Sequence, residues 1–254
     1  MRKERVSAPL PVPLPVAHVT VARWLDAILG VGELQPQHCD VFGKSLLYFS
    51  YGGVFYRPTR LNTQHAVDWP IGMVFSPGVL EAVTSVYPFD TGAMARNAYF
   101  EKWRKRLAPF RTRFRIKTTN ALATAPRLVK LLYATNRRYV TGNVARSASR
   151  RMTPIPLLAS FLGADMTPHV DHRQRTIECI AESAVAFAEH LEWVGVPDRA
   201  LERVAQGVYR WTHPRMPVLY PYRPTRNFNP ADIAAEMHAA ARAAFVQRFL
   251  DLEK

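Results

Sequence analysis

Positive charge is concentrated in one segment of this chain, and that segment limits how the chain can fold. Between Arg96 and Arg151 there are sixteen lysines or arginines and one acid, Glu101, so the rest of the chain, with 18 of the 34 basic and 19 of the 20 acidic residues, is nearly neutral. Sixteen cations cannot fold tightly on themselves without repulsion, so we expect them on an exposed face that attracts phosphates. A solvated surface that only keeps the protein soluble is the alternative.

The basic segment is expected to form a helical side lobe, inserted at residues 95–155. Helical character is clearest around residues 99–107 and 127–139, whereas the polar, proline-bearing residues 147–156 favour a mobile loop. The basic side chains expected to contact nucleic acid are Arg104, Lys105, Arg106, Arg111, Arg113, Arg115, Arg137, Arg138, Arg150 and Arg151.

The rest of the composition is typical of one folded domain, expected at residues 17–254. With 48% hydrophobic and 21% charged residues, the chain has enough apolar material for a core. Residues 1–16 carry four prolines, which exclude a helix and favour an extended tail. Cys39 and Cys179 lack the spacing of a zinc site or a disulfide framework, so we expect no metal and a reducing cytoplasm. No apolar run reaches the roughly 20 residues that cross a bilayer, so no membrane partner is expected.

Short apolar segments bounded by glycine and proline predict an α/β (α+β) domain. Strands are expected at residues 17–20, 45–51, 71–75, 176–181 and 191–196. Helices are expected directly after residue 20, at residues 78–86 and 198–209, and from Pro230 after an N-cap at Asn229. The apolar stripe of this last helix is Ile233, Met237, Ala241, Ala244, Phe245 and Phe249.

His18 and Thr20 lie two residues apart in the first expected strand. A strand places residues i and i+2 on one side, so the imidazole and the hydroxyl can both hydrogen-bond a ribose or an amide of one ligand. The alternative is structural: Thr20 caps the following helix, and His18 is a half-buried histidine with its hydrogen bonds satisfied.

An aromatic strand, which contains Tyr48, ends at Gly52 and Gly53, and Tyr56 and Arg57 follow. Ring faces beside a guanidinium suit a nicotinamide or a base together with its phosphate. Aromatic residues in strands more often belong to the core, and this alternative remains open.

Glu178 lies in the middle of an apolar, β-branched strand, where a carboxylate is rarely buried without a partner. On a strand it shares one face with Ile180 and Glu182. Exposure at a sheet edge explains such a residue, but the interposed Ile180 favours a cleft.

The order of these features resembles the ADP-ribosyltransferase superfamily, and within it the DarT-like enzymes that modify DNA. DarT-like sequences begin with a histidine–threonine strand and a helix that ends near glycine, as His18 to Gly32 does here. They also carry an arginine three positions before the catalytic glutamate, as Arg175 and Glu178 do. The resemblance covers roughly residues 16–200 in element order.

This sequence departs from the DarT-like pattern at two places. Those enzymes place an arginine soon after the aromatic strand, whereas Gly52 and Gly53 intervene here and Arg57 is the first candidate. The expected loop at residues 87–93 has no counterpart.

The resemblance implies split, mostly antiparallel sheets around a cleft that binds NAD. Glu178 would be the catalytic residue: it would hold the ribose 2′-hydroxyl, stabilise the oxocarbenium-like ribose formed when nicotinamide leaves, and take the proton of the nucleophile. The residues implied to contact NAD are His18, Thr20, Tyr48, Tyr56, Arg57 and Arg175.

Three functions follow as hypotheses. The first is an enzyme, an ADP-ribosyltransferase that acts on nucleic acid, with a role as a toxin or phage-defence effector by analogy with its relatives; an antitoxin is not identifiable from the sequence. The second is a non-catalytic nucleic-acid-binding protein in which Glu178 is structural. A protein-directed transferase is the third, because a basic surface also attracts acidic proteins.

Overall fold

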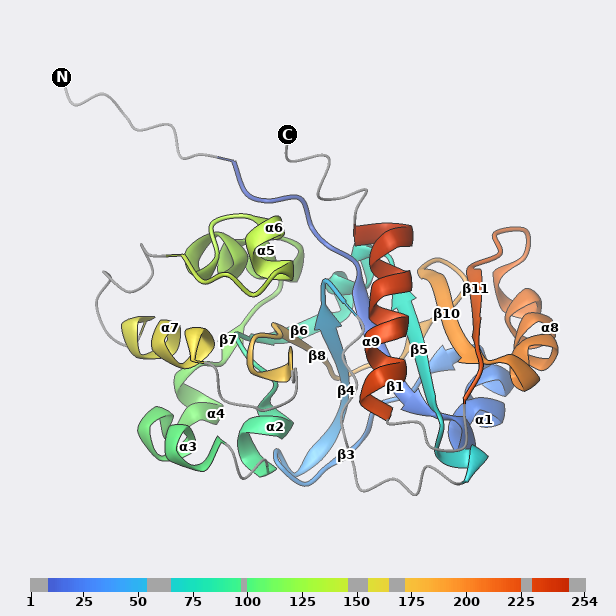
Figure 1. Cartoon of the computed structure of the whole chain (residues 1–254), viewed down its shortest axis with the longest axis horizontal. Helices are drawn as coiled ribbons and strands as arrows, with labels where there is room; N and C mark the ends of the chain where they lie inside the picture. The colour runs from blue at the N-terminus through green and yellow to red at the C-terminus, as the bar shows by residue number, and fades with distance from the viewer. Residues whose placement is uncertain are drawn as a thin grey trace.

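The computed structural model describes residues 9–53, 65–96, 100–145, 155–164, 172–224 and 230–246, which form a mixed α/β fold (Figure 1). The strands of its main sheet are β1 Val16–Val21, β3 Gln37–Cys39, β4 Lys44–Tyr51, β5 Pro70–Phe75, β6 Val83–Tyr87, β7 Ile116–Lys117, β8 Glu178–Ala181, β10 Leu191–Pro197 and β11 Val218–Tyr222. They follow the order β11-β10-β5-β1-β4-β8-β6-β7, with β3 beside β4, and within the described residues all pairs but β10–β11 are antiparallel. The predicted fold class is therefore confirmed.

Helices surround this sheet. The α-helices are α1 Leu25–Val31, α2 Thr91–Arg96, α3 Glu101–Leu107, α4 Phe110–Arg113, α5 Ala121–Leu132, α6 Asn136–Val140, α7 Ile155–Gly163, α8 Leu201–Thr212 and α9 Pro230–Ala241. Helices α3 to α7 form a lobe at one end of the molecule, and α1 and α8 lie at the other (Figure 1). A two-stranded sheet pairs β2 Glu33–Leu34 with β9 Val185–Ala186. No helix in the described part of the chain has the length and apolar character needed to span a bilayer.

The main sheet divides along the line between β1 and β4. These two strands pair only at one end, through Val16 with Tyr51 and Ala17 with Ser50. Beyond that point β1 continues beside β5, whereas β4 continues beside β8. Two groups of strands, β11-β10-β5-β1 and β4-β8-β6-β7, therefore diverge from a shared corner.

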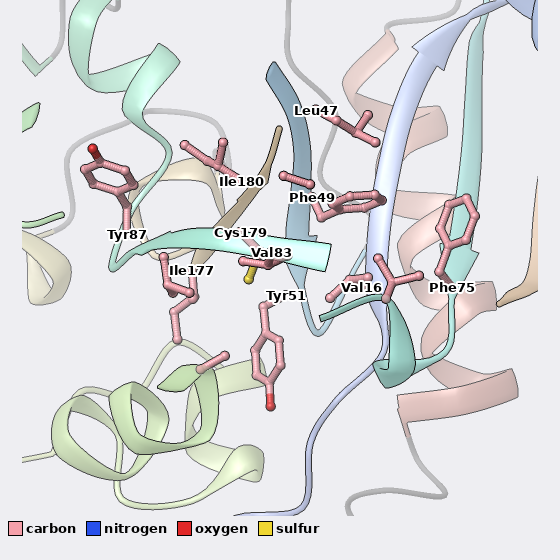
Figure 2. Packing of buried hydrophobic residues seen from close by; sticks show 14 of the residues in the cluster. Val16, Leu47, Phe49, Tyr51, Phe75, Val83, Tyr87, Ile177, Cys179 and Ile180 are labelled. Atoms are coloured by element: carbon pink, nitrogen blue, oxygen red, sulfur yellow. The ribbon is translucent and has the colours of Figure 1, made fainter. Parts of the chain in front are cut away.

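The core fills one face of the sheet around this corner. Leu47, Phe49 and Tyr51 alternate along β4 and are buried, and the Phe49 ring meets the Phe75 ring edge-on at a centroid distance of 5.8 Å. Figure 2 shows Phe49 and Phe75 close to Val16 of β1, whereas the Tyr51 ring points toward the helical lobe. Burial of each such side chain contributes about 1.5–3 kcal/mol, so the corner holds both groups of strands together.

The last helix covers the opposite face. Ile233, Met237 and Ala241 of α9 are buried in a second cluster with Val74 and Trp193. This confirms the apolar stripe predicted for the last helix, with Phe245 also buried in the cluster and Ala244 packed against it. Its predicted N-cap Asn229 and its last stripe residue Phe249 lie outside the described residues.

The proline-rich lead-in runs across the helical lobe before it enters β1. Lys130 Nζ and Asn136 Nδ2 donate to the carbonyl oxygens of Pro9 and Val12, at 2.7 and 2.8 Å. The backbone nitrogen of Leu14 then donates to the Tyr51 hydroxyl at 2.9 Å. The described part of this segment is thus attached to both lobe and sheet.

Tyr139 of α6 joins the lobe to the corner of the sheet. Its hydroxyl donates to the Tyr51 carbonyl oxygen at 2.8 Å and accepts a hydrogen bond from the Ile177 backbone nitrogen at 3.0 Å. Both bonds are buried, and burial raises the pKa of Tyr139 well above its ordinary value.

Several predicted elements differ in the structure. Residues 78–86 were expected to be helical, but a 3₁₀-helix ends at Ala82 and β6 follows, because Val83 to Tyr87 pairs with β8. The helix expected at residues 127–139 is broken between α5 and α6, where Ala134 has a φ of 74°. Helix α7 was not predicted, and most of the expected loop at residues 147–156 lies outside the described residues.

Candidate active-site cleft

A cleft opens where β1 and β4 diverge. It has a volume of about 640 Å³, within the range of small-molecule sites. Its walls combine an apolar side, from α1 and the start of β4, with polar side chains from β1, β3 and α2. The residues that line it are His18, Val19, Thr20, Trp24, Ala27, Ile28, Val31, Glu33, Leu34, Gln35, Gln37, His38, Cys39, Asp40, Val41, Leu46, Leu47, Tyr48, Gly92 and Arg96.

His18 bridges the two strands just beyond the point where their backbones separate. Its Nδ1 atom lies 2.9 Å from the Tyr48 carbonyl oxygen, which takes the place of a strand-to-strand hydrogen bond. Because a carbonyl only accepts, Nδ1 carries the proton of the neutral imidazole, and Nε2 is then an acceptor. A hydroxyl group in the cleft is the kind of donor that suits such a nitrogen.

Thr20 lines the same cleft and does not cap the following helix. The residue at the helix N-cap is Val21, and no side chain caps the helix there. The structural alternative for Thr20 is therefore wrong, and Thr20 lines the cleft together with His18.

Tyr48 contributes an aromatic ring to the opposite wall. Its hydroxyl donates to Cys39 Sγ at 2.7 Å, which ties β4 to β3 and fixes the ring beside the cleft. Trp24, a 3₁₀-helical residue before α1, adds a second ring that is 56% exposed. A large exposed indole at a cleft is the feature that sequence analysis overlooked, because Trp24 lies in a segment that was expected only to form the helix after residue 20.

Arg96 is the arginine that the structure brings to the cleft. It lies at the end of α2, and its Nη2 atom is 2.9 Å from Asp40 Oδ2. His38 Nε2 lies 3.7 Å from Asp40 Oδ1. Among the described lining residues Arg96 is the only lysine or arginine, and sequence analysis missed it because its segment was interpreted as the start of the basic lobe.

Glu178 is buried beneath the first turn of α2, with 2% of its surface exposed. Its Oε2 atom accepts from the Thr91 hydroxyl at 2.5 Å and from the Thr91 backbone nitrogen at 3.2 Å. It lies opposite Ser50 of β4, on the sheet face that also carries Tyr48. The carboxylate thus supports the helix whose Gly92 and Arg96 line the cleft, and edge exposure does not account for it.

The charge of Glu178 contributes to the pKa values of two buried neighbours. Burial raises the pKa of Tyr87 to about 12, and the nearby Glu178 charge adds to this rise. Burial also raises the pKa of the Cys179 thiol, again with a smaller contribution from Glu178. Both neighbours therefore keep their protons at ordinary pH.

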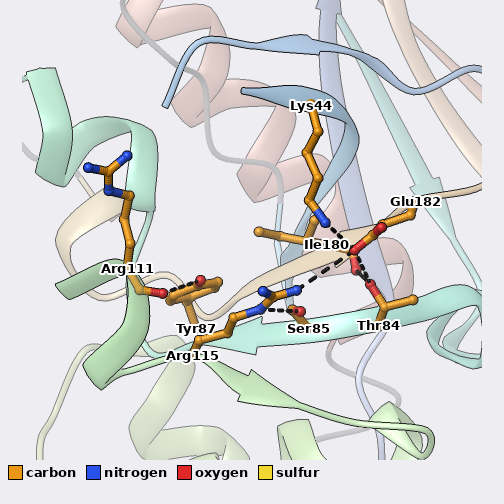
Figure 3. Close-up of polar contacts among 8 residues, drawn as sticks. All are labelled: Lys44, Thr84, Ser85, Tyr87, Arg111, Arg115, Ile180 and Glu182. Carbon is orange, nitrogen blue, oxygen red and sulfur yellow. Dashed lines mark hydrogen bonds and ion pairs between the residues drawn. The ribbon is translucent and has the colours of Figure 1, made fainter. Parts of the chain in front are cut away.

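Glu182, which follows β8, belongs to a separate network at the other end of the strand (Figure 3). Its Oε1 atom accepts from Lys44 Nζ at 2.5 Å and from Thr84 Oγ1 at 3.3 Å, and Arg115 Nη2 lies 3.7 Å away. The hydrogen bond from Lys44 is the main reason that the pKa of Glu182 is lowered. Glu178 and Glu182 therefore have different surroundings.

Several arginines predicted to contact nucleic acid instead hydrogen-bond to neighbouring parts of the fold. Arg104 Nε donates to the Met94 carbonyl oxygen at 2.7 Å, and Arg115 Nε donates to Ser85 Oγ at 2.9 Å. Arg111 is exposed, and its Nη1 atom donates to the Val41 carbonyl oxygen at 2.5 Å. These three arginines attach the lobe to α2, to β6 and to the turn between β3 and β4.

Other predicted contacts lie on the surface. Lys105 is exposed and forms an ion pair with Glu101 at 2.9 Å, a contact of low expected energy. Arg106 and Arg113 are exposed and lie over the rings of Trp103 and Phe114. Arg137 and Arg138 are exposed on α6. The predicted site residues Tyr56, Arg57, Arg150 and Arg151 lie outside the described residues.

Arg175 is not among the residues that line the cleft. Its Nε atom donates to the Leu162 carbonyl oxygen at 2.9 Å, and its side chain packs against Gly142 in the lobe. It precedes β8, which begins only at Glu178, so the three-residue spacing does not place both side chains on one strand.

No protein-family model and no curated protein matches this chain. Three solved structures of DarT from Thermus sp. 2.9 are similar to it. The complex with NAD+ has 13% identity, covers 85% of this chain and 98% of that chain, and has a TM-score of 0.43. The complex with carba-NAD+ has 14% identity, 84% and 97% coverage and a TM-score of 0.41. The complex with ADP-ribosylated ssDNA has 13% identity, 84% and 96% coverage and a TM-score of 0.42. The chain is thus distantly similar to DarT, the family whose pattern its sequence resembles.

Proposed function

We propose that this protein is an NAD-dependent ADP-ribosyltransferase whose acceptor is a nucleic acid. The observation that carries the proposal is the cleft between β1 and β4, in which the His18 imidazole, the Thr20 hydroxyl and the Tyr48 ring face one volume, with Glu178 under the adjoining helix α2. Polar groups that hold hydroxyls, next to aromatic rings, suit a ribose joined to a planar base.

The proposed reaction transfers ADP-ribose from NAD, which is a substrate. The bond between the nicotinamide nitrogen and ribose C1′ breaks, and nicotinamide leaves with the electron pair. A nucleophilic atom of the nucleic acid forms the new bond to C1′ and loses its proton to a carboxylate or to water. Negative charge beside C1′ stabilises the positive charge that develops on the ribose.

Different residues of the cleft are proposed to bind different parts of NAD. His18 Nε2 accepts a ribose hydroxyl, and Thr20 binds the same side of the substrate. Tyr48 and Trp24 provide faces for the planar rings. Arg96 supplies the guanidinium that meets the phosphates, and Asp40 gives up its ion pair when they bind.

Glu178 is assigned the catalytic role, which requires its carboxylate to meet the ribose. The carboxylate is held by Thr91, at the start of the helix whose Gly92 lines the cleft. The Thr91 contacts aim the carboxylate toward this helix. Exchange of the Thr91 hydroxyl for a ribose hydroxyl places the negative charge beside C1′.

The basic lobe supports a nucleic-acid acceptor over a protein. Its exposed cations lie on helices α3 and α4, with α3 packed against α2, one of whose residues, Arg96, lines the cleft, and on α6 at the far side of the lobe (Figure 1). We also propose a role as a toxin or phage-defence effector, by analogy with the DarT-like enzymes that the sequence resembles.

A non-catalytic nucleic-acid-binding protein is the second candidate function. The observation that favours it is the Thr91–Glu178 contact, which is also what a purely structural helix cap looks like. The two candidates differ in one measurement: incubation with NAD, with and without DNA or RNA, followed by quantification of nicotinamide. Release that nucleic acid stimulates supports the transferase, and binding of nucleic acid without release supports the second candidate.

His18→Ala should weaken NAD binding by about tenfold, the value expected for one lost hydrogen bond of about 1.4 kcal/mol. The loss of stability should stay near 1 kcal/mol, because water in the cleft can replace Nδ1 at the Tyr48 carbonyl. Calorimetric titration with NAD measures the first quantity and thermal denaturation the second. A large stability loss with unchanged affinity would show that His18 is only a structural bridge.

Replacement of Lys105, Arg106 and Arg113 by glutamine should weaken binding to unrelated nucleic-acid sequences. These three side chains are exposed. Arg104 is left unchanged because its hydrogen bond to the Met94 carbonyl oxygen means that its loss could also affect the fold. If each cation meets one phosphate of a single strand, the slope of log affinity against log salt should fall by about 2. Unchanged affinity between low and moderate salt would show that this surface is only solvated.

A further inference from the structure

A second cavity lies in the helical lobe and contains two arginines. It has a volume of about 530 Å³ and is lined by Arg138, Gly142, Asn143, Val144, Gly163 and Arg175. It shares no lining residue with the cleft. Helices α6 and α7, which end at its walls, lie in the lobe, away from α1 at the other side of the cleft (Figure 1).

Backbone carbonyls fix the two guanidinium groups. Arg138 donates through Nε to the Asn143 oxygen at 3.2 Å and through Nη2 to the Val144 oxygen at 3.0 Å. Arg175 donates through Nε to the Leu162 oxygen at 2.9 Å. A guanidinium has five N–H donors, so these bonds orient each group while most of its donors remain for other partners. Neither forms an ion pair with a carboxylate of the described residues.

Gly142 brings the two cations to one turn. It has a φ of 72°, and a Cβ atom at this position would lie 2.7 Å from Arg175 Nη1. The left-handed φ favours glycine, and the missing Cβ lets the Arg175 guanidinium lie against the 142–144 turn, which also accepts the bonds of Arg138. Two like charges held at one turn repel each other, and none of the six lining residues is acidic. An oxyanion in the cavity would offset that repulsion.

We propose that this cavity binds a backbone phosphate of a nucleic-acid strand, outside the cleft. The inference rests on the proposed function in taking a nucleic acid as the partner. Guanidinium groups match the geometry of phosphate oxygens with two parallel hydrogen bonds, which a lysine cannot reproduce. The phosphate belongs to a strand because four of the six lining residues come from the most basic segment of the chain, where exposed cations such as Arg137 continue the positive surface.

The test uses fluorescence anisotropy of the full chain with a labelled 15-nucleotide oligothymidine at several salt concentrations. Arg138→Gln combined with Arg175→Gln should weaken binding at least tenfold and lower the salt slope by about 0.7, the value for one phosphate of a single strand. Arg138→Lys with Arg175→Lys should weaken binding about three- to tenfold and leave the salt slope unchanged. Lysine keeps the charge but cannot make the two parallel hydrogen bonds of a guanidinium.

Lys117→Gln with Arg127→Gln is the matched control. Lys117 on β7 and Arg127 on α5 are both exposed and lie outside the cavity, so the same loss of charge should change affinity by less than threefold. If the glutamine pair at the cavity binds the oligonucleotide as the parent or the control does, the proposal is overturned. The lysine pair guards against misfolding, because it keeps both charges near the carbonyls.

A parallel titration with inorganic phosphate separates a strand from a small anion. If the parent binds inorganic phosphate through Arg138 and Arg175 while the glutamine pair leaves oligonucleotide affinity unchanged, a free anion is the ligand and the strand proposal is overturned. Nicotinamide release by the parent is measured independently. Its absence would contradict the proposed function, while a selective loss of oligonucleotide binding in the glutamine pair would still support the cavity.

Discussion

Glu178→Gln should lower nicotinamide release from NAD by about 10²–10³-fold, the cost of removing one charge or donor that stabilises a transition state. The amide has the shape of the carboxylate, and its oxygen can still accept from the Thr91 hydroxyl and backbone nitrogen. The helix α2 should therefore remain in place, with a stability loss of about 1 kcal/mol from the missing charge at its N-terminus. Chromatographic quantification of nicotinamide and thermal denaturation check the two parts.

Two further variants separate catalysis from support of α2. Glu182→Gln removes a carboxylate four residues later that pairs with Lys44 and lies in another network, so activity should persist. Thr91→Val removes the 2.5 Å hydrogen bond but keeps the Glu178 charge, and it should retain at least a tenth of the activity. Equal losses in Thr91→Val and Glu178→Gln would indicate that the carboxylate only supports the helix. Full activity of Glu178→Gln would remove Glu178 from the mechanism.

Tyr139→Phe should destabilise the fold by about 2–4 kcal/mol, because the hydroxyl serves two buried backbone groups and each costs about 1–3 kcal/mol when its partner is lost. These groups, the Tyr51 oxygen and the Ile177 nitrogen, lie where the helical lobe meets the corner of the sheet. Urea denaturation measures the loss. Tyr209→Phe is the control, since Tyr209 is 51% exposed on α8, and it should change stability by less than 0.5 kcal/mol.

The stabilities of the parent and of Tyr139→Phe should become more similar at high pH. Burial raises the pKa of Tyr139 in the folded state, so above the ordinary tyrosine pKa of about 10 the folded chain holds a proton that the unfolded chain releases. Stability of the parent therefore falls as pH rises beyond that value, and phenylalanine has no such dependence. A stability difference that stayed constant from pH 8 to pH 11 would contradict this account.

Local patterns predicted the first strand and helix correctly. The stripe of α1 ends at Gly32, whose φ of 70° is a left-handed conformation that glycine adopts without strain. His18 and Thr20 could be placed together because a strand has a fixed two-residue repeat. The divergence of β1 and β4 beside them could not be predicted from the sequence, since it depends on where β4 stops pairing with β1.

Tertiary contacts decided the elements that were wrong. Val83 to Tyr87 has an apolar spacing compatible with a helix, but pairing with β8 between Glu178 and Ala181 makes it a strand. Arg175 was grouped with Glu178 by spacing alone, although the chain turns between them and the arginine enters the lobe. Arg96 escaped notice because its role depends on the position of α2 above the cleft, which no local pattern encodes.

The order of strands has a consequence for synthesis of this protein. Strand β4 is made early, yet its neighbour across from Ser50 is Glu178, and the whole helical lobe is translated between them. A nascent chain that ends before β8 therefore holds His18 and Thr20 without the carboxylate, and its β4 lacks a partner on one edge. Pairing across so long a sequence separation is slow. Glu178 is consequently added only after about 70% of this chain has been translated, and the chemistry proposed for Glu178 cannot begin on a partly made chain.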